Sequence, residues 1–183
     1  MSTRAEAAIE DLYQVPDDGK AEIVNGEVVL MSPTGRTPHR AGFKISLSLY
    51  QHEQTVGSGI AVADNAGFRV NLPLRKSFSP DAAWYVGPDT GMKFFEGAPR
   101  FAVEVRSEND YGPVAEREMA AKRADYFAAG TLVVLDVDLL SDEVVRVYRA
   151  DNPNTPTVYH RGEVVEAEPA VPGWSMAVDE LFR

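Results

Sequence analysis

The clearest pattern in the chain is an alternation of apolar and charged side chains between Phe101 and Arg106. Phe101, Val103 and Val105 share one face of the expected strand, whereas Glu104 and Arg106 lie on the other face. A carboxylate within such a core-like strand costs on the order of several kcal/mol unless it is paired or holds a cation. An internal ion pair with Arg106 or with a lysine on a helix would satisfy Glu104 without any function. A bound metal ion would satisfy it equally well.

Other stretches predict further strands. Asn25-Gly26 separates two apolar runs, and a type I′ turn needs positive φ at both central residues, so residues 21–30 predict a β-hairpin. The nearly all-apolar stretch 131–137 predicts a central strand that is buried on both faces. Shorter strands are predicted at 60–63, 68–72, 79–86 and 144–149, and a second hairpin is predicted from 157–160 and 163–167, after a turn at 151–156.

Two stretches have the period of a helix. One begins near Thr37, with Pro38 in its first turn, and the other runs from 116 to a left-handed end at Gly130. In the first helix, the side chains expected on the buried face are His39, Phe43, Leu47 and Tyr50. Strands interrupted by two helices predict one α/β domain over residues 1–183. We expect a central mixed β-sheet flanked by helices, in which the N-terminal β-hairpin, the strand at 79–86, the strand of Glu104 and the strand at 131–137 are consecutive parts.

Composition narrows the class of protein. The 183 residues are 44% hydrophobic and 25% charged, as in an ordinary globular protein, and include no cysteine, which excludes disulfides and thiolate metal sites. No stretch approaches the ~20 apolar residues of a membrane helix, and the N-terminus lacks the apolar core of a signal peptide, so we expect a cytoplasmic protein without a membrane partner. The net charge of −10 argues against non-specific coating of nucleic acid, although a local basic rim on an acidic body remains compatible with a nuclease. The basic pair Arg75-Lys76 fits either such a rim or a solvated turn.

Three charged residues in succession suggest chemistry. Asp81 follows Pro80 at the start of one predicted strand, Glu104 lies on another, and Lys122 lies on the helix that comes next. Mg²⁺ prefers oxygen ligands, and Asp81, Glu104 and the Val105 carbonyl would supply three of them. The Lys122 ammonium would orient the attacking water and stabilise charge that develops on a phosphate. Lys122 without such a role would pair on the helix surface with Glu118, four residues before it.

Four stretches carry a resemblance to a known family: EIVNGEVVLMSPTG (22–35), SPDAAWYV (79–86), VEVRSEND (103–110) and the run from Lys122 to Gly130. Together they resemble the Uma2 (DUF820) family of restriction-endonuclease-like proteins, within the PD-(D/E)xK nuclease superfamily, over residues 22–182. The resemblance implies a restriction-endonuclease-like core and an endonuclease that hydrolyses phosphodiester bonds in DNA with Mg²⁺ or Mn²⁺. It also implies that Glu22 belongs to the acidic cluster, whereas from the pattern alone Glu22 is equally a solvated charge at a strand edge. Arg106 occupies the strand position where the superfamily often has lysine, so the catalytic cation is either Lys122 or Arg106.

Two other classes of function remain open. Arg106 in place of lysine and the acidic composition are compatible with a nuclease-fold protein that has lost catalysis and serves in binding or assembly. A metal-dependent hydrolase with a substrate other than DNA would need the same acids. For the oligomeric state we expect a homodimer, because Phe94-Phe95 is an aromatic pair that the pattern predicts to be exposed in a loop, and because many nucleases cut two strands.

Overall fold

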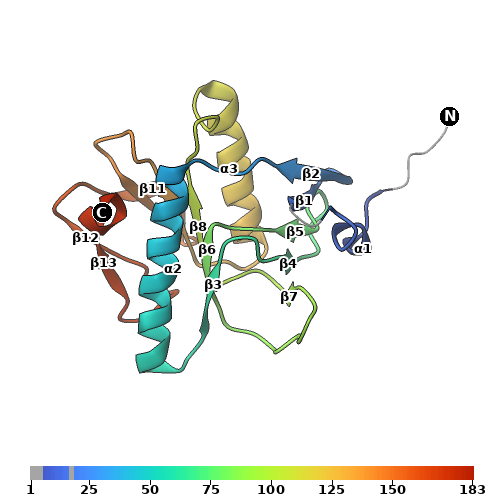
Figure 1. Ribbon diagram of the computed structural model, residues 1–183, viewed down its shortest axis with the longest axis horizontal. Coiled ribbons are helices and arrows are strands. Elements are labelled where there is room, and N and C mark those ends of the chain that lie inside the picture. The colour runs from blue at the N-terminus through green and yellow to red at the C-terminus, as the bar shows by residue number, and fades with distance from the viewer. Residues whose placement is uncertain (1–5, 17–18) are drawn as a thin grey trace.

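The computed structural model describes residues 6–16 and 19–183, and it forms a mixed β-sheet with one long helix on each face (Figure 1). The sheet has six strands in the order β11-β10-β9-β8-β6-β3. β8 and β9 run parallel, and all other neighbours run antiparallel. These strands are β3 (Ile60–Ala63), β6 (Ala82–Tyr85), β8 (Phe101–Val105), β9 (Val133–Val137), β10 (Val145–Arg149) and β11 (Asn152–Tyr159). The predicted central mixed sheet is confirmed.

The remaining elements surround this sheet. Its helices are α1 (Ile9–Leu12), α2 (Arg36–Val56), α3 (Pro113–Ala128) and the 3₁₀ helix η1 (Val178–Phe182). Three smaller sheets consist of β1 (Lys20–Val24) with β2 (Glu27–Met31), of β4 (Phe68–Arg69) between β5 (Ser77–Phe78) and β7 (Phe95–Glu96), and of β12 (Val164–Glu166) with β13 (Ser175–Ala177). Across the described residues, no helix is long and apolar enough to cross a membrane.

The two long helices cover opposite faces because β8 presents a different set of side chains to each. Val103 lies in one core cluster with Ile45 of α2, and Ala102 lies in the other with Tyr126 of α3. The predicted alternation along β8 is therefore confirmed. Glu104 projects on the α3 side, at the end of the strand, and this position determines which residues it meets.

The predicted hairpin is confirmed as β1 and β2, with φ of 52° at Asn25 and 74° at Gly26, as a type I′ turn requires. Its predicted place in the central sheet is wrong, because β1 and β2 form a sheet of their own. The outer edge of β1 bonds instead to the start of β5 and the residue before it: the Lys76 N–H donates to the Ile23 carbonyl, and the Ile23 N–H donates to the Ser77 hydroxyl. These bonds carry β1 across the end of the central sheet, next to the predicted site.

The buried face of α2 differs from the predicted one. The side chains expected inside are exposed, namely His39, Phe43, Leu47 and Tyr50. The buried positions are Ala41, Gly42, Ile45, Ser46 and Leu49. Small residues let the helix lie close to the sheet, since a Cβ at Gly42 would be only 3.6 Å from the Asp81 Cβ. Close approach of the backbone therefore outweighs the size of the apolar side chains, and it leaves an apolar stripe on the outside.

α3 places Lys122 and Tyr126 one turn apart, both facing the sheet. It begins earlier than predicted, at Pro113, and its end is confirmed by a positive φ of 105° at Gly130. Tyr126 is fully buried against β8, and its ring stacks on Phe78 at 4.0 Å between centroids. This packing holds the inner face of α3 against the acids described below.

The second predicted hairpin is wrong. Residues 157–159 belong to β11, which pairs with β10, whereas β12 pairs with β13. The predicted turn at 151–156 is mostly strand, because β11 starts at Asn152 and lies at the edge of the sheet. An edge strand tolerates Pro153 and Pro156, since the missing N–H of each can face solvent.

The aromatic pair behind the dimer argument is engaged within the chain. Phe94 stacks on Tyr13, with the ring centroids 4.2 Å apart, and Phe95 stacks on Phe68 at 4.8 Å. Both side chains are half-buried. The premise that they are exposed is therefore wrong, and the homodimer stays a prediction.

Candidate active site

Asp81 lies immediately before β6, where that strand meets the end of β8. Ala82 pairs with Val103 in an antiparallel register, so the residue before Ala82, Asp81, lies opposite the residue after Val103, Glu104. The Asp81 N–H donates to the Val103 carbonyl at 3.0 Å, and the Val105 N–H donates to Asp81 Oδ2 at 2.7 Å. The first bond fixes the main chain of Asp81 at the end of the sheet, and the second fixes its carboxylate. The Val105 carbonyl, predicted as a metal ligand, stays a prediction.

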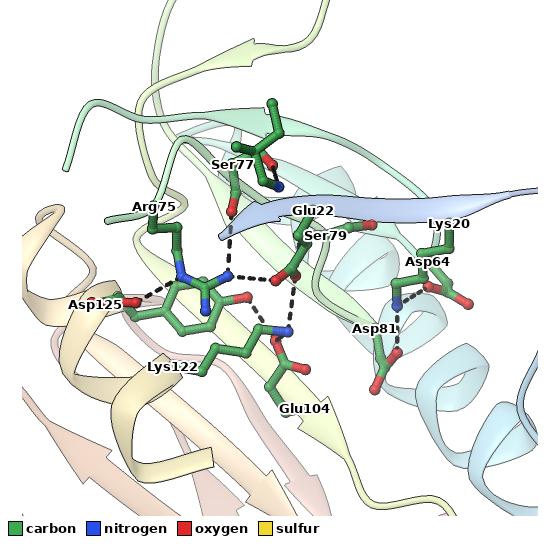
Figure 2. Close-up of polar contacts among 12 residues, drawn as sticks. Lys20, Glu22, Asp64, Arg75, Ser77, Ser79, Asp81, Glu104, Lys122 and Asp125 are labelled. Carbon is green, nitrogen blue, oxygen red and sulfur yellow. Dashed lines mark hydrogen bonds and ion pairs between the residues drawn. The ribbon is translucent and has the colours of Figure 1, made fainter. Parts of the chain in front are cut away.

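Glu104 meets two side chains of α3. The Lys122 ammonium lies 2.9 Å from Glu104 Oε1, and the Tyr126 hydroxyl donates to the same oxygen at 2.6 Å. In Figure 2 the second oxygen of Glu104 points to the side of the strand on which Asp81 lies. The α3 contacts therefore fix one carboxylate oxygen and direct the other toward Asp81.

Lys122 joins Glu104 to Glu22, a residue of β1. Its ammonium lies 3.0 Å from Glu22 Oε1, and only 17% of its side chain is exposed (Figure 2). Burial favours the neutral amine, but attraction to Glu104 and Glu22 outweighs it and raises the pKa of Lys122 above its usual value. Lys122 is therefore a permanent cation that faces the acids, and the surface pairing with Glu118 does not describe it.

Glu22 is an interior charge, not a solvated one. It is 2% exposed, accepts the Ser79 N–H at 2.8 Å, and pairs with the Arg75 guanidinium at 2.5 Å. Burial alone would raise the pKa of Glu22, but Lys122 and Arg75 together lower it below the usual value. Arg75 also pairs with Asp125 of α3 at 2.8 Å. Arg75 is therefore neither part of a basic rim nor a solvated side chain in a turn. It is a buried cation whose ion pair favours the ionised form of Glu22.

Lys20 is a member of the site that the sequence reasoning missed. Its ammonium lies 2.8 Å from Asp81 Oδ1 and 2.7 Å from Asp64 Oδ1 (Figure 2). Burial opposes its charge, but attraction to Asp81 and Glu104 gives Lys20 a raised pKa. Lys20 and Glu22 share a face of β1, two residues apart, so one strand supplies a cation to Asp81 and a carboxylate to Lys122. That alternation was readable in the sequence, but the place of the hairpin was not.

The carboxylates crowd one another. Burial raises the pKa of Glu104, repulsion from Asp81 and Glu22 raises it further, and the nearby Lys122 only partly offsets this. Burial, together with the negative charges of Glu104 and Glu22, also raises the pKa of Tyr126 well above its usual value. Glu104 thus sits where an additional positive charge, whether a proton or a metal ion, is favoured.

The carboxylates of Asp81 and Glu104 fit one hard divalent cation whose remaining ligands would come from water and from the substrate. Among the described residues, no group of three or more histidine, cysteine or acidic side chains could hold a metal ion. Mg²⁺, however, usually binds through one or two carboxylates, with water and substrate phosphates completing its octahedron. Asp81 and Glu104 offer those two carboxylates at the end of one pair of strands, and their chemistry suits Mg²⁺ or Mn²⁺.

Arg106, the other predicted cation, belongs to a separate network. Its Nε and Nη2 each donate to one oxygen of Asp136 at 2.8 Å, and Nη1 pairs with Glu116. Arg106 is 7% exposed and Asp136 is 3% exposed. Asp136 and Glu116 therefore engage Arg106, and of the two predicted cations it is Lys122 that contacts Glu104.

Comparisons with known proteins concern the sequence and the fold of the chain. A family model described as "Uma2: Putative restriction endonuclease" matches residues 9–179. The fold is similar to a crystal structure from Anabaena variabilis that is described as a putative nuclease belonging to DUF820. The TM-score is 0.74 at 13% identity, over 96% of this chain and 97% of that one. No curated protein matches the sequence significantly.

Proposed function

The chain belongs to the Uma2 family, and on that premise we propose that it is a Mg²⁺-dependent endonuclease that hydrolyses phosphodiester bonds in DNA. One observation carries the proposal: a buried, permanently charged Lys122 contacts Glu104, whose own pKa is raised by burial and by neighbouring acids. A purely structural ion pair would leave its acid stabilised in the ionised form. Here burial and the neighbouring acids still favour the protonated form of Glu104 over the ionised form. Titrating groups that are perturbed in this way are typical of active sites.

Asp81 and Glu104 would hold the metal ion, which supplies charge neutralisation at the phosphate and a more acidic water. Asp81 is held by the Val105 N–H on Oδ2 and by the Lys20 ammonium on Oδ1, so a metal ion would use a remaining lone pair of one of these oxygens. Glu104 keeps Oε1 on Lys122 and Tyr126 and offers its second oxygen. The two acids thereby determine where the scissile phosphate lies.

Lys122 has the donors to act on the water and the phosphate. An ammonium carries three N–H donors, of which Glu22 and Glu104 take two. The third can hold the attacking water, or a phosphate oxygen, as the new bond to phosphorus forms and the bond to the sugar oxygen breaks, while the water gives a proton to bulk solvent and the departing sugar oxygen takes one from it. Glu22, braced by Arg75, keeps the lysine in place and protonated. Lys122 therefore stabilises charge and does not act as a base.

A substrate panel tests the proposal. Plasmid DNA, single-stranded DNA and RNA are incubated with Mg²⁺, with Mn²⁺ or with EDTA, and the products are resolved on gels. We expect cleavage of DNA that requires the metal. The matched control is Glu143→Gln, which neutralises an exposed carboxylate paired with Arg146, in the connection between β9 and β10, and should cut like the parent. If the parent binds metal but cuts no nucleic acid, its substrate lies outside that class.

A further inference from the structure

A cavity of about 190 Å³ opens beside Asp81, between the first turns of α2 and the end of the sheet. Gly42 and Val105 form part of its wall, Asp64 and Asp81 lie along it, and Phe43 is on the α2 side. Pockets for drug-sized ligands typically have about 300–1,000 Å³, so this cavity suits one small ring system. Its wall includes Asp81, so an occupant would be adjacent to the proposed metal site.

The α2 side of the cavity is aromatic and open. His39 and Phe43 lie one turn apart, both line the cavity, and the Phe43 side chain is 50% exposed. An exposed ring beside a cavity offers a face on which a flat aromatic ligand can stack. A packing role does not account for Phe43, because the buried face of α2 is the one that carries Ile45 and Leu49.

Two exposed arginines lie on the same part of α2 as this aromatic edge. Arg36 and Arg40 occupy the same helix, four residues apart, and both are exposed. Neither forms an ion pair with any acid in the part of the chain that the structure describes. The Arg40 guanidinium lies 5.7 Å from the Phe43 ring centroid. On a protein with a net charge of −10, Arg40 beside an aromatic ring and Arg36 one turn before it form a local attraction for an anion that carries a ring.

We infer that this cavity receives one unpaired nucleobase of the substrate strand, stacked on Phe43, while Arg36 and Arg40 contact the phosphates outside. The inference rests on the proposed nuclease function and extends it to a substrate class, namely single-stranded nucleic acid or a strand with an unstacked base. A base inside a duplex is stacked and paired, and it cannot enter a side cavity without being extruded. Positive grooves combined with aromatic platforms are the usual means of binding single strands.

Gly42 keeps the cavity open and provides a variant that should fold. An added Cβ would lie 3.6 Å from the Asp81 Cβ and 3.9 Å from Val105 Cγ2, both ordinary van der Waals distances. Alanine is also the better helix former, so Gly42→Ala should remain folded while it takes space from the cavity. It leaves Phe43, Arg36 and Arg40 unchanged, so a loss of binding in this variant can be assigned to the volume of the cavity and not to the aromatic ring or the cations.

The test measures binding by fluorescence anisotropy with a labelled 12-nucleotide DNA single strand, its duplex and a fully abasic strand of equal length. Ca²⁺ replaces Mg²⁺, and gels verify that the strands stay intact. We expect the single strand to bind more tightly than the duplex. Phe43→Ala should weaken single-strand binding about 5- to 150-fold, the range of one base stacked on an aromatic ring. Gly42→Ala should weaken it too, and Leu47→Ala, an exposed residue one turn further along α2, should not.

The abasic strand provides the decisive comparison, because it keeps the phosphates and lacks the ring. Parent and Phe43→Ala should bind it equally. Equal binding of the normal and abasic strands by the parent, equal effects of Phe43→Ala and Leu47→Ala, or no binding of any strand would each overturn the inference. If the parent cuts DNA but Phe43 has no effect, only the cavity proposal fails. If Phe43-dependent binding occurs without any cleavage, the proposed nuclease function fails, and the cavity is a site for an unpaired base of a bound strand that is not cut.

Discussion

Glu104→Gln should stabilise the metal-free protein at neutral pH. The carboxylate is buried beside Asp81 and Glu22, and these causes raise its pKa above that of an unfolded glutamate. A glutamine keeps the shape and an oxygen that accepts from Lys122 and Tyr126, now 2.9 Å and 2.6 Å from Oε1. The substitution removes repulsion and the desolvation of a charge. Lys122 still has Glu22 at 3.0 Å, so no cation is left unpaired.

The pH dependence gives the sign of the effect. Because the folded state raises the pKa of Glu104, it binds the proton more tightly than the unfolded state does. The favourable contribution of Glu104 is complete below its unfolded pKa and is lost as the pH rises through the folded pKa. At neutral pH the charged carboxylate therefore opposes folding. Single stabilising substitutions commonly contribute about 0.5–2 kcal/mol, and we expect Glu104→Gln to gain an amount in that range.

Urea denaturation in EDTA measures this directly, with Glu143→Gln as the control for loss of an exposed carboxylate. The advantage of Glu104→Gln should be largest near pH 7–8 and should shrink toward pH 4–5, roughly the unfolded range of a glutamate. Saturating Mg²⁺ should reverse the order, since a ligand at 100 times its Kd stabilises the parent by about 2.7 kcal/mol. A variant that is less stable than the parent in EDTA at pH 7, or a difference that does not change with pH, would refute the reasoning.

Three further predictions follow from the same contacts. Lys122→Met should destabilise the fold by about 3–5 kcal/mol at neutral pH, as for other buried pairs that lose one partner. Its deficit in urea denaturation should shrink on acidification, because Glu104 and Glu22 then take up protons. Arg106→Lys should lower stability through loss of the two-pronged contact with Asp136, yet calorimetry should show unchanged metal affinity, since that network is separate. Metal affinity of the parent should fall as the pH drops, and the fall should begin above the usual range of a glutamate, because protons compete for an acid with a raised pKa.

The strands that carry the acids were predictable from sequence because local rules determine them. The alternation around Val103 places Glu104 away from the α2 face, and the Asn25-Gly26 turn specifies the hairpin. Both patterns depend only on neighbours in the chain. The contact between Lys122 and Glu104 follows from order along the chain, because the helix after β8 returns over the face on which Glu104 lies.

The rest depended on tertiary packing that no local pattern contains. α2 turns its small residues inward because backbone approach at Gly42 governs the fit, and the larger Phe43 stays outside. Lys20 reaches Asp81 only because β1 bonds to the segment before β5 and crosses the end of the sheet. Arg75 likewise becomes a buried partner of Glu22 only through that crossing.

The central claim is that Asp81 and Glu104 hold the metal whereas Lys122 acts on the substrate. The most direct test is calorimetric titration with Mn²⁺ of folded Asp81→Asn and Lys122→Met, with plasmid cleavage measured on the same preparations. The account predicts that Asp81→Asn loses both metal binding and cleavage, and that Lys122→Met binds the metal but does not cut. Metal binding by Asp81→Asn equal to that of the parent, or full cleavage by Lys122→Met, would contradict it.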